Sequence, residues 1–234
     1  MRALRNLLIF LAILVVIGFI LPAEFRDGYY FYYAGRLAET TGNIAGAVEA
    51  YKTSSEANQD SALFARARAR ALNDLAESTK STSKYNEAFR FCTEWIEKHE
   101  FDPGVWMLYI ERARAEWGID RKHLALQTIK KALDINPTDY IALVYHGIMI
   151  RDFRPGDIES IQSSIPIFEQ AVKVRRHSRT YWAHLEQAKA FWMLKDENNA
   201  LIQINQALAQ YPPRDIKDEA ERLRTEIQSS GRSR

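Results

Sequence analysis

Small and apolar residues recur along this chain at helical spacing, and one arrangement of them returns five times. A small residue in a charged segment is followed four positions later by an aromatic residue or isoleucine, then by an alanine–leucine pair and often by proline. The clearest copies span residues 42–51, 124–137 and 199–212, and weaker copies span residues 85–92 and 165–172. Positions three and four apart share one face of a helix, and the period of roughly 36 to 41 residues is close to that of two-helix repeats. The pattern predicts an array of helical hairpins.

The small residues stand where two paired helices must approach closely, since a larger side chain would push the helices apart. In the first helix of a hairpin the crossing positions are Gly35, Ala113, Gly147 and Ala188. Near the start of the second helix they are Ala47, Ala88, Ala125 and Ala200. Pro137 and Pro212 follow two of the second helices and are expected to end them, because proline lacks an N–H group.

On these residues the chain resembles the tetratricopeptide repeat (TPR) family over about residues 28–212. The resemblance implies an all-α fold, a right-handed superhelical solenoid of about five helical hairpins. We expect residues 24–213 to form the solenoid, residues 214–228 a capping helix and residues 229–234 a disordered tail. In the capping segment Ile216, Ala220, Leu223 and Ile227 fall on one side of a helix.

Two hairpins depart from the pattern. In the second, residues 78–84 are rich in serine and threonine and predict a lengthened turn, while alternating alanines in residues 65–71 allow several registers. In the fourth, residues 154–157 and Pro166 indicate a second helix that is either kinked or starts one turn late.

The N-terminus carries an apolar run at residues 7–21 that follows Arg2 and Arg5 and ends at Pro22. It predicts a membrane-targeting segment within residues 1–23, either an uncleaved anchor or a secretory signal peptide. We favour a single transmembrane helix. Cleavage of a signal peptide requires small residues at the cleavage site, and these are poorly placed around Leu21. The basic residues before the run keep the N-terminus in the cytoplasm, which puts the repeats outside the inner membrane, in the periplasm of a Gram-negative cell.

Four tyrosines, Tyr29, Tyr30, Tyr32 and Tyr33, follow this segment closely. They fit two interpretations: an aromatic belt at the membrane interface, or the first helix of the repeats with Phe31 and Ala34 facing inward. The two are compatible if that helix begins at the membrane surface.

Candidate chemistry is sparse. The five histidines form no metal-binding pair, the single cysteine, Cys92, falls on an apolar helix face, and no glycine-rich phosphate loop or Gly-x-Ser-x-Gly motif occurs. Without Arg2 and Arg5 the basic and acidic residues balance at 30 each, so no basic surface for nucleic acid is indicated. We therefore expect no enzyme activity, cofactor, metal or nucleic-acid partner.

The resemblance instead implies binding of protein segments on the concave face, where the residue after the small residue of each first helix tends to lie. It points to Arg36, Arg114 and Lys189, and one turn later to Trp117, Arg151 and Trp192. Arginine and tryptophan are enriched at binding hot spots, and this lining suits an acidic or aromatic segment. The alternative is that the charges form a solvated face and the tryptophans pack between repeats.

The sequence thus predicts a membrane-anchored scaffold or adaptor for membrane or envelope proteins. Two alternatives remain: a periplasmic chaperone that holds extended or unfolded clients, and an accessory subunit of a membrane enzyme complex.

Overall fold

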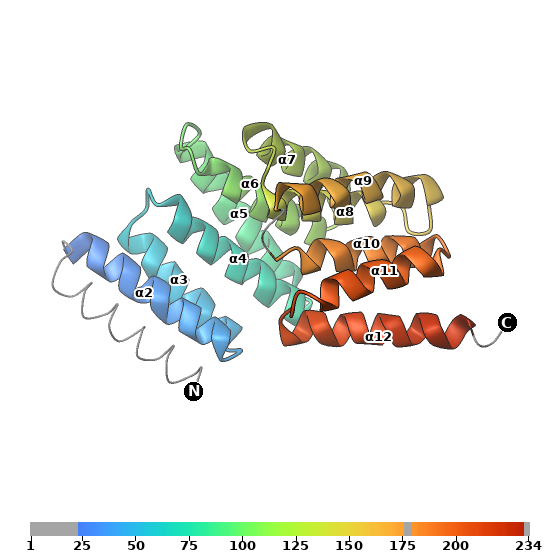
Figure 1. Cartoon of the computed structure of the whole chain (residues 1–234). Helices are drawn as coiled ribbons and strands as arrows, with labels where there is room; N and C mark the ends of the chain where they lie inside the picture. The colour runs from blue at the N-terminus through green and yellow to red at the C-terminus, as the bar shows by residue number, and fades with distance from the viewer. Residues whose placement is uncertain (1–22, 176–178, 232–234) are drawn as a thin grey trace. The chain divides into compact units, whose positions relative to one another are not determined.

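The computed structural model describes residues 23–175 and 179–231, and these form eleven α-helices and no strand (Figure 1). The helices are α2 (Ala23–Thr40), α3 (Ile44–Ala57), α4 (Ala62–Thr79), α5 (Thr82–Lys98), α6 (Val105–Gly118), α7 (Lys122–Ile135), α8 (Tyr140–Arg151), α9 (Ile158–Val174), α10 (Tyr181–Met193), α11 (Glu197–Leu208) and α12 (Arg214–Gly231). The expected all-α architecture is confirmed for this part of the chain. Helices α2 to α11 follow one another as five predicted pairs, and α12 stands after the last pair.

The chain divides into two compact units. The first ends at Arg121 and the second begins at Lys122, so the boundary falls between α6 and α7. Each unit has its own hydrophobic core: Tyr51 and Leu72 are fully buried in the first, and Phe168 and Leu185 in the second.

All five turns inside the predicted pairs are built alike. The residue two positions before the second helix has a positive φ, and in four of the five turns the next residue caps that helix through its side chain, accepting a hydrogen bond from an N–H of the first turn. The positive-φ residues are Gly42, Lys80, Asp120, Gly156 and Lys195, with φ values of 77°, 53°, 62°, 83° and 63°. The capping residues are Asn43, Ser81, Asp157 and Asp196. This shared turn is independent support for the five-hairpin pattern.

Two glycines at predicted helix crossings have no room for a side chain. A Cβ atom on Gly35 would lie 2.6 Å from the ring of Tyr51, and one on Gly147 would lie 2.5 Å from the ring of Phe168. Both rings belong to the second helix of the same pair. The small residue and the aromatic ring of the repeat pattern therefore lie against each other.

The alternating alanines of α4 occupy two sides of the helix. Ala67 and Ala71 pack with Tyr51 in one core cluster, whereas Ala65 and Ala69 pack with Trp95 and its neighbours in another. Because all four alanines are buried, the several registers that the sequence allowed correspond to two packed faces of one helix.

The expected long turn at residues 78–84 is wrong. Helix α4 continues to Thr79 and α5 begins at Thr82, and the turn consists of Lys80 and Ser81. The Ser81 hydroxyl accepts a hydrogen bond from the Lys84 amide at 3.3 Å, so the serine that suggested a loop starts a helix.

The second helix of the fourth pair is continuous. Helix α9 begins directly after its cap Asp157 and runs through Pro166 to Val174. Proline here leaves one carbonyl of the preceding turn without its usual helical partner, yet the helix extends eight residues beyond it.

Helix α12 packs as its sequence suggested. Ala220 and Ile227 are buried against α10 and α11, with Ile216 and Leu223 partly buried beside them. The helix extends to Gly231, three residues beyond the expected boundary.

The predicted membrane segment at residues 7–21 lies outside the described residues. Within residues 23–175 and 179–231, no helix combines the length and the apolarity that crossing a membrane requires.

Candidate protein-binding site

The candidate residues lie on the first helices of the predicted pairs: Arg36 on α2, Arg114 and Trp117 on α6, Arg151 on α8, and Lys189 and Trp192 on α10. The structure shows what surrounds each one. Most of the cations are held by carboxylates of the same unit.

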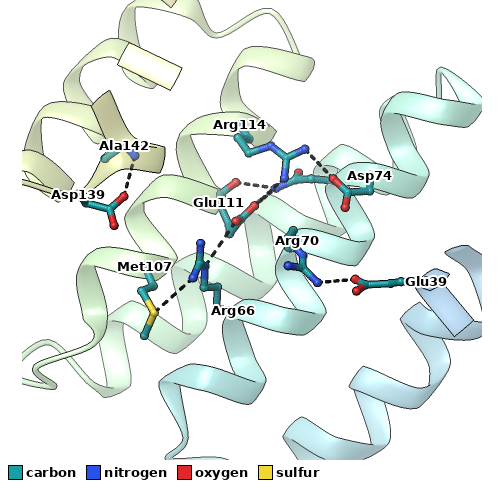
Figure 2. Close-up of polar contacts among 10 residues, drawn as sticks. Glu39, Arg66, Arg70, Asp74, Met107, Glu111, Arg114, Asp139 and Ala142 are labelled. Atoms are coloured by element: carbon teal, nitrogen blue, oxygen red, sulfur yellow. Dashed lines mark hydrogen bonds and ion pairs between the residues drawn. The ribbon is translucent and has the colours of Figure 1, made fainter. Parts of the chain in front are cut away.

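In the first unit a buried carboxylate organises the contacts between α4 and α6. Glu111 is 1 % exposed, and its Oε2 atom accepts hydrogen bonds from Arg114 at 3.0 Å and from the Asn73 amide at 3.2 Å (Figure 2). Asn73 also donates to the backbone carbonyl of Glu111 at 2.8 Å. The other carboxylate oxygen, Oε1, has the Arg66 guanidinium at 3.9 Å. We call Glu111, Asn73, Arg66 and Arg114 the Glu111 network.

Arg114 also reaches back to α4. Its Nη2 atom donates to Asp74 at 2.7 Å and lies 3.6 Å from Glu77. With three carboxylates around it the Arg114 side chain is 9 % exposed. The side chain predicted to meet a ligand is thus a cross-link between two neighbouring first helices.

Arg36 is the most exposed of the candidate cations. Its side chain is 52 % exposed, and its contact with Glu39 is a long one of 3.9 Å within α2. Glu39 is engaged more closely by Arg70 of α4, as Figure 2 shows. Arg36 therefore keeps most of its surface available to a partner.

In the second unit a second buried carboxylate takes the same role between α8 and α10. The Oε2 atom of Glu186 accepts a hydrogen bond from Arg151 at 2.7 Å, and its Oε1 atom accepts one from Lys189 at 2.7 Å. Lys189 also lies 2.8 Å from Glu219 of α12, and Arg151 binds Asp152 through two nitrogens at 2.7 and 2.9 Å. We call Glu186, Arg151, Lys189, Asp152 and Glu219 the Glu186 network.

The electrostatics of this network favour the charged forms. Burial alone would lower the pKa of Arg151, but its hydrogen bonds and ion pairs with Asp152 and Glu186 outweigh burial and raise the pKa. The same balance, with Glu186 as the main partner, raises the pKa of Lys189. Both cations are therefore integral parts of the packing of α8, α10 and α12.

The two candidate tryptophans are partly buried. The Trp192 indole nitrogen lies 3.3 Å from Glu226 of α12, and the Lys195 ammonium lies 5.2 Å from the ring centre. Trp192 also packs against the core of α10, α11 and α12. It joins the last predicted pair to α12 while part of its ring stays at the surface.

The structure thus brings Arg151 and Lys189 together on one carboxylate and places Arg114 on the equivalent carboxylate of the other unit. A role for these residues in partner binding stays a prediction, with Arg36 as the cation best exposed for it. The sequence held a signal for the internal pairs, because Glu111 and Glu186 each stand three residues before the cation on the same helix.

The tyrosines after the apolar segment lie on α2, the first helix of the first pair. Tyr29 and Tyr32 face Phe64 of α4, with ring centres 5.0 and 5.5 Å apart, and Tyr32 also lies 5.7 Å from Tyr51. Tyr30 is 47 % exposed. The tyrosines therefore lie on the first repeat helix, but it is Tyr29 and Tyr32 that face α4, whereas Phe31 and Ala34, which were expected to face inward, are only partly buried. Contact with a membrane stays a prediction, and Tyr30 has the exposed ring for it.

Residues 23–175 and 179–231 contain no group of three or more His, Cys, Asp or Glu side chains arranged for a metal ion. Cys92 is fully buried, and burial, followed by the charge of Glu111, raises the pKa of its thiol well above the ordinary value. A thiol in this state is a poor nucleophile.

No known family model matches the sequence. No curated protein matches it either. Solved structures do match. TTC0263, a thermophilic TPR protein of Thermus thermophilus, is 16% identical with a TM-score of 0.65, over 84% of this chain and 98% of that chain. MamA from Desulfovibrio magneticus is 13% identical with a TM-score of 0.53, over 81% and 97%.

Yeast Tom70 is 14% identical with a TM-score of 0.63, over 88% of this chain and 41% of that chain. Identities this low show the fold alone. The chain is similar in fold to TPR proteins, as the helix pairs, their turns and their crossings already indicated.

Proposed function

We propose that this chain is a membrane-anchored scaffold or adaptor that holds protein partners in a bacterial envelope complex. The observation that carries the proposal is the direct succession of two features. The apolar run ends at Leu21, and α2, the first helix of a TPR-like fold, begins at Ala23. A segment suited to a membrane is thus joined almost without a linker to a fold suited to binding proteins.

This succession supports a function in which the repeats act close to the bilayer. Confining a binding surface to a membrane raises its effective concentration toward partners in the same membrane. A short connection also restricts the orientations of the first helices, which include Tyr30 and Arg36.

Co-purification tests the proposal. Tagged full-length protein is isolated from gently solubilised membranes, and the proteins that come with it are quantified by mass spectrometry. We expect one or two partners near equimolar amounts. A broad set of envelope proteins in small amounts would favour a chaperone instead, and an equimolar partner that is itself an enzyme would identify an accessory subunit.

The membrane anchor is tested separately. Phosphatase fused to the C-terminus should be active outside the cytoplasm, and the protein should stay in the membrane after a salt wash with Met1 still present. A mature N-terminus near Glu24 would show a cleaved signal peptide, and reporter activity in the cytoplasm would overturn the orientation.

The candidate binding surface is tested at its most exposed cation. Arg36→Glu should weaken recovery of the partner without a change in thermal stability, because Arg36 makes one long ion pair in the described part of the chain. Lys52→Glu, an equally large charge change at an exposed position of α3, is the matched control. Equal recovery from both variants would remove Arg36 from the binding surface.

A further inference from the structure

The second unit contains a cavity that is lined by none of the residues of the Glu111 and Glu186 networks. It has a volume of about 680 Å³ and lies at the start of α8 and α10, within the size range of ligand sites in proteins. Its lining consists of Tyr140, Ile141, Arg175, Arg179, Tyr181, Trp182 and Gln210. We call it the Arg175 pocket.

The walls of this pocket are held in place by hydrogen bonds. The Tyr140 hydroxyl accepts from the Ala183 amide at 3.1 Å, and the Gln210 side chain accepts from the Thr180 amide at 2.6 Å and donates to the Thr180 hydroxyl at 3.0 Å. These contacts satisfy N–H groups at the start of α10 through side chains from other helices and turns. The wall is therefore formed before any ligand arrives.

The aromatic side chains are fixed as well. The Trp182 ring meets the Tyr145 ring edge to face, with centres 5.1 Å apart. The Arg175 guanidinium lies over the Tyr140 ring, 4.4 Å from its centre. This cation–π contact orients Arg175 and leaves its N–H groups without a hydrogen-bond acceptor among the described residues.

The charge of the pocket is one-sided. Two arginines line it and no carboxylate does, and in the part of the chain that the structure describes neither Arg175 nor Arg179 forms an ion pair. The positive end of α10 adds to the same potential.

A pocket in the first unit gives the contrast. Its volume is about 450 Å³, and its lining includes Arg68, His99 and three carboxylates. There Arg68 lies 3.8 Å from Glu56, and His99 lies 3.1 Å from Asp60. The arginine of that pocket has a carboxylate partner within the same lining, which also contains Lys98, so the unpaired arginines of the Arg175 pocket are not the general rule for this fold.

We propose that the Arg175 pocket binds an acidic segment of a protein partner, with a carboxylate on Arg175 and Arg179 and an apolar or aromatic neighbour against Trp182. The proposal rests on the proposed function, since it assigns one contact of the scaffold. Five of the seven lining residues are Tyr, Trp or Arg, the types that dominate protein-binding hot spots. The guanidinium fork matches a carboxylate with two parallel hydrogen bonds.

Peptide binding to full-length protein in detergent tests this inference by fluorescence anisotropy. The probe is a fluorescein-labelled heptapeptide with Asp and Glu on both sides of one Phe, and the matched peptide replaces them with Asn and Gln. We expect the acidic peptide to bind at least tenfold more tightly, with an affinity that falls as salt rises. Equal binding of the two peptides would overturn the proposal.

Charge reversal distinguishes a change in peptide preference from a simple loss of peptide binding. Arg175→Gln combined with Arg179→Gln should weaken the acidic peptide about tenfold, and Arg175→Glu with Arg179→Glu should transfer the preference to a peptide with Lys in place of Asp and Glu. Both arginines are exposed, so circular dichroism should show unchanged folding. Arg90→Gln, at an exposed position of α5, is the control and should bind as the unaltered protein does.

Two further measurements, phosphate competition and co-purification with the double variant, are decisive. Inorganic phosphate that displaces the acidic peptide at equal concentration would reduce the pocket to a simple anion site and overturn the assignment to a protein segment. Loss of peptide binding in the double variant, with the co-purified partners also lost, supports the pocket as their contact. Partners that remain at full stoichiometry with the double variant would overturn the pocket while the scaffold function stands.

Discussion

Two buried glutamates occupy equivalent places in the two units, but their surroundings differ. Glu111 and Glu186 each lie two residues before the small residue of a helix crossing, and each joins two neighbouring first helices. Both oxygens of Glu186 receive a cation at 2.7 Å. Glu111 has one well-bonded oxygen, and its other oxygen lies 3.9 Å from Arg66.

The neighbouring atoms show the same difference. Among the described residues, Arg66 Nε and Asn73 Oδ1 are buried without a hydrogen-bond partner, and both lie in the Glu111 network. The Glu186 network contains no such atom in the described part of the chain. The repeat thus specifies where the buried carboxylate goes, while the donors that satisfy it come from other helices and differ from one unit to the next.

The largest effect is expected from removing the better-paired carboxylate. Glu186→Ala removes a carboxylate that is shared by two cations. Arg151, which is 5 % exposed, loses one of its two carboxylate partners, and Lys189 loses one of its two as well. Breaking a buried ion pair on one side costs about 3 to 5 kcal/mol. Urea denaturation followed by circular dichroism should show this loss of unfolding free energy.

The matched variant in the other unit sharpens the comparison. Glu111→Ala should cost less than Glu186→Ala, because Arg114 retains Asp74 and Glu77 and Arg66 is already poorly paired. An equal or larger loss for Glu111→Ala would show that the 3.9 Å contact stabilises as much as the short ones and would break the comparison.

The sequence predicted the shared parts of the two units well. The hairpins, the crossings at Gly35 and Gly147 and the apolar face of α12 follow from residue size and helical spacing, which are local properties. The turn at Lys80 and Ser81 was missed because serine favours loops and helix starts alike. The registers of α4 stayed open because its alanines serve two faces.

The binding surface was harder to predict. The pattern located the first-helix cations Arg114 and Lys189 but not their partners Asp74 and Glu219, which come from other helices. The Arg175 pocket was missed for the same reason: residues from α8, α10 and two turns form it, and no local motif connects them.

A pH effect is expected in the second unit. Burial, together with the nearby charge of Lys130, lowers the pKa of His146 from 6.5 to about 4, and its Nε2 atom has no hydrogen-bond partner among the described residues. The unfolded chain then binds a proton more readily than the folded one, so stability is complete above pH 6.5 and falls as pH drops toward 4. One pKa unit corresponds to about 1.4 kcal/mol, and the ring keeps some hydration, so we expect a loss of roughly 2 kcal/mol.

The variant His146→Gln isolates this contribution. Its unfolding free energy, measured between pH 7 and 4, should depend less on pH than that of the unaltered protein, although the carboxylates contribute to both curves. Parallel curves for the two proteins would mean that His146 titrates equally in the folded and unfolded states.

The glycines at the helix crossings, Gly35 and Gly147, allow the two units to be compared at equivalent positions of the repeat. Gly147→Ala and Gly35→Ala each place a methyl group within 2.6 Å of a buried ring, and such overpacking costs about 1 to 3 kcal/mol. Thermal unfolding should show similar losses for both. Gly156→Ala tests positive φ instead, because a Cβ there meets no atom within 4 Å. Stability unchanged at Gly35 or Gly147 would mean that the paired helices can separate without loss.

The smallest effect is expected at the weakest link of the Glu111 network. The Arg66 side chain is 27 % exposed, its Nε atom has no hydrogen-bond partner in the described residues, and one of its guanidinium nitrogens faces the Met107 sulfur at 3.8 Å. Arg66→Met keeps an unbranched side chain of similar volume, although it is two atoms shorter, and it removes a poorly satisfied charge. Replacing such a charge by an apolar group of similar volume is often neutral or stabilising, so the unfolding free energy should change by less than about 1 kcal/mol.

Lys189→Met, at the matching short contact of the Glu186 network, should cost more, since it leaves Glu186 and Glu219 without their shared cation. If Arg66→Met proves the more damaging of the two, distance to the carboxylate does not rank these cations, and the difference between the two networks has another cause.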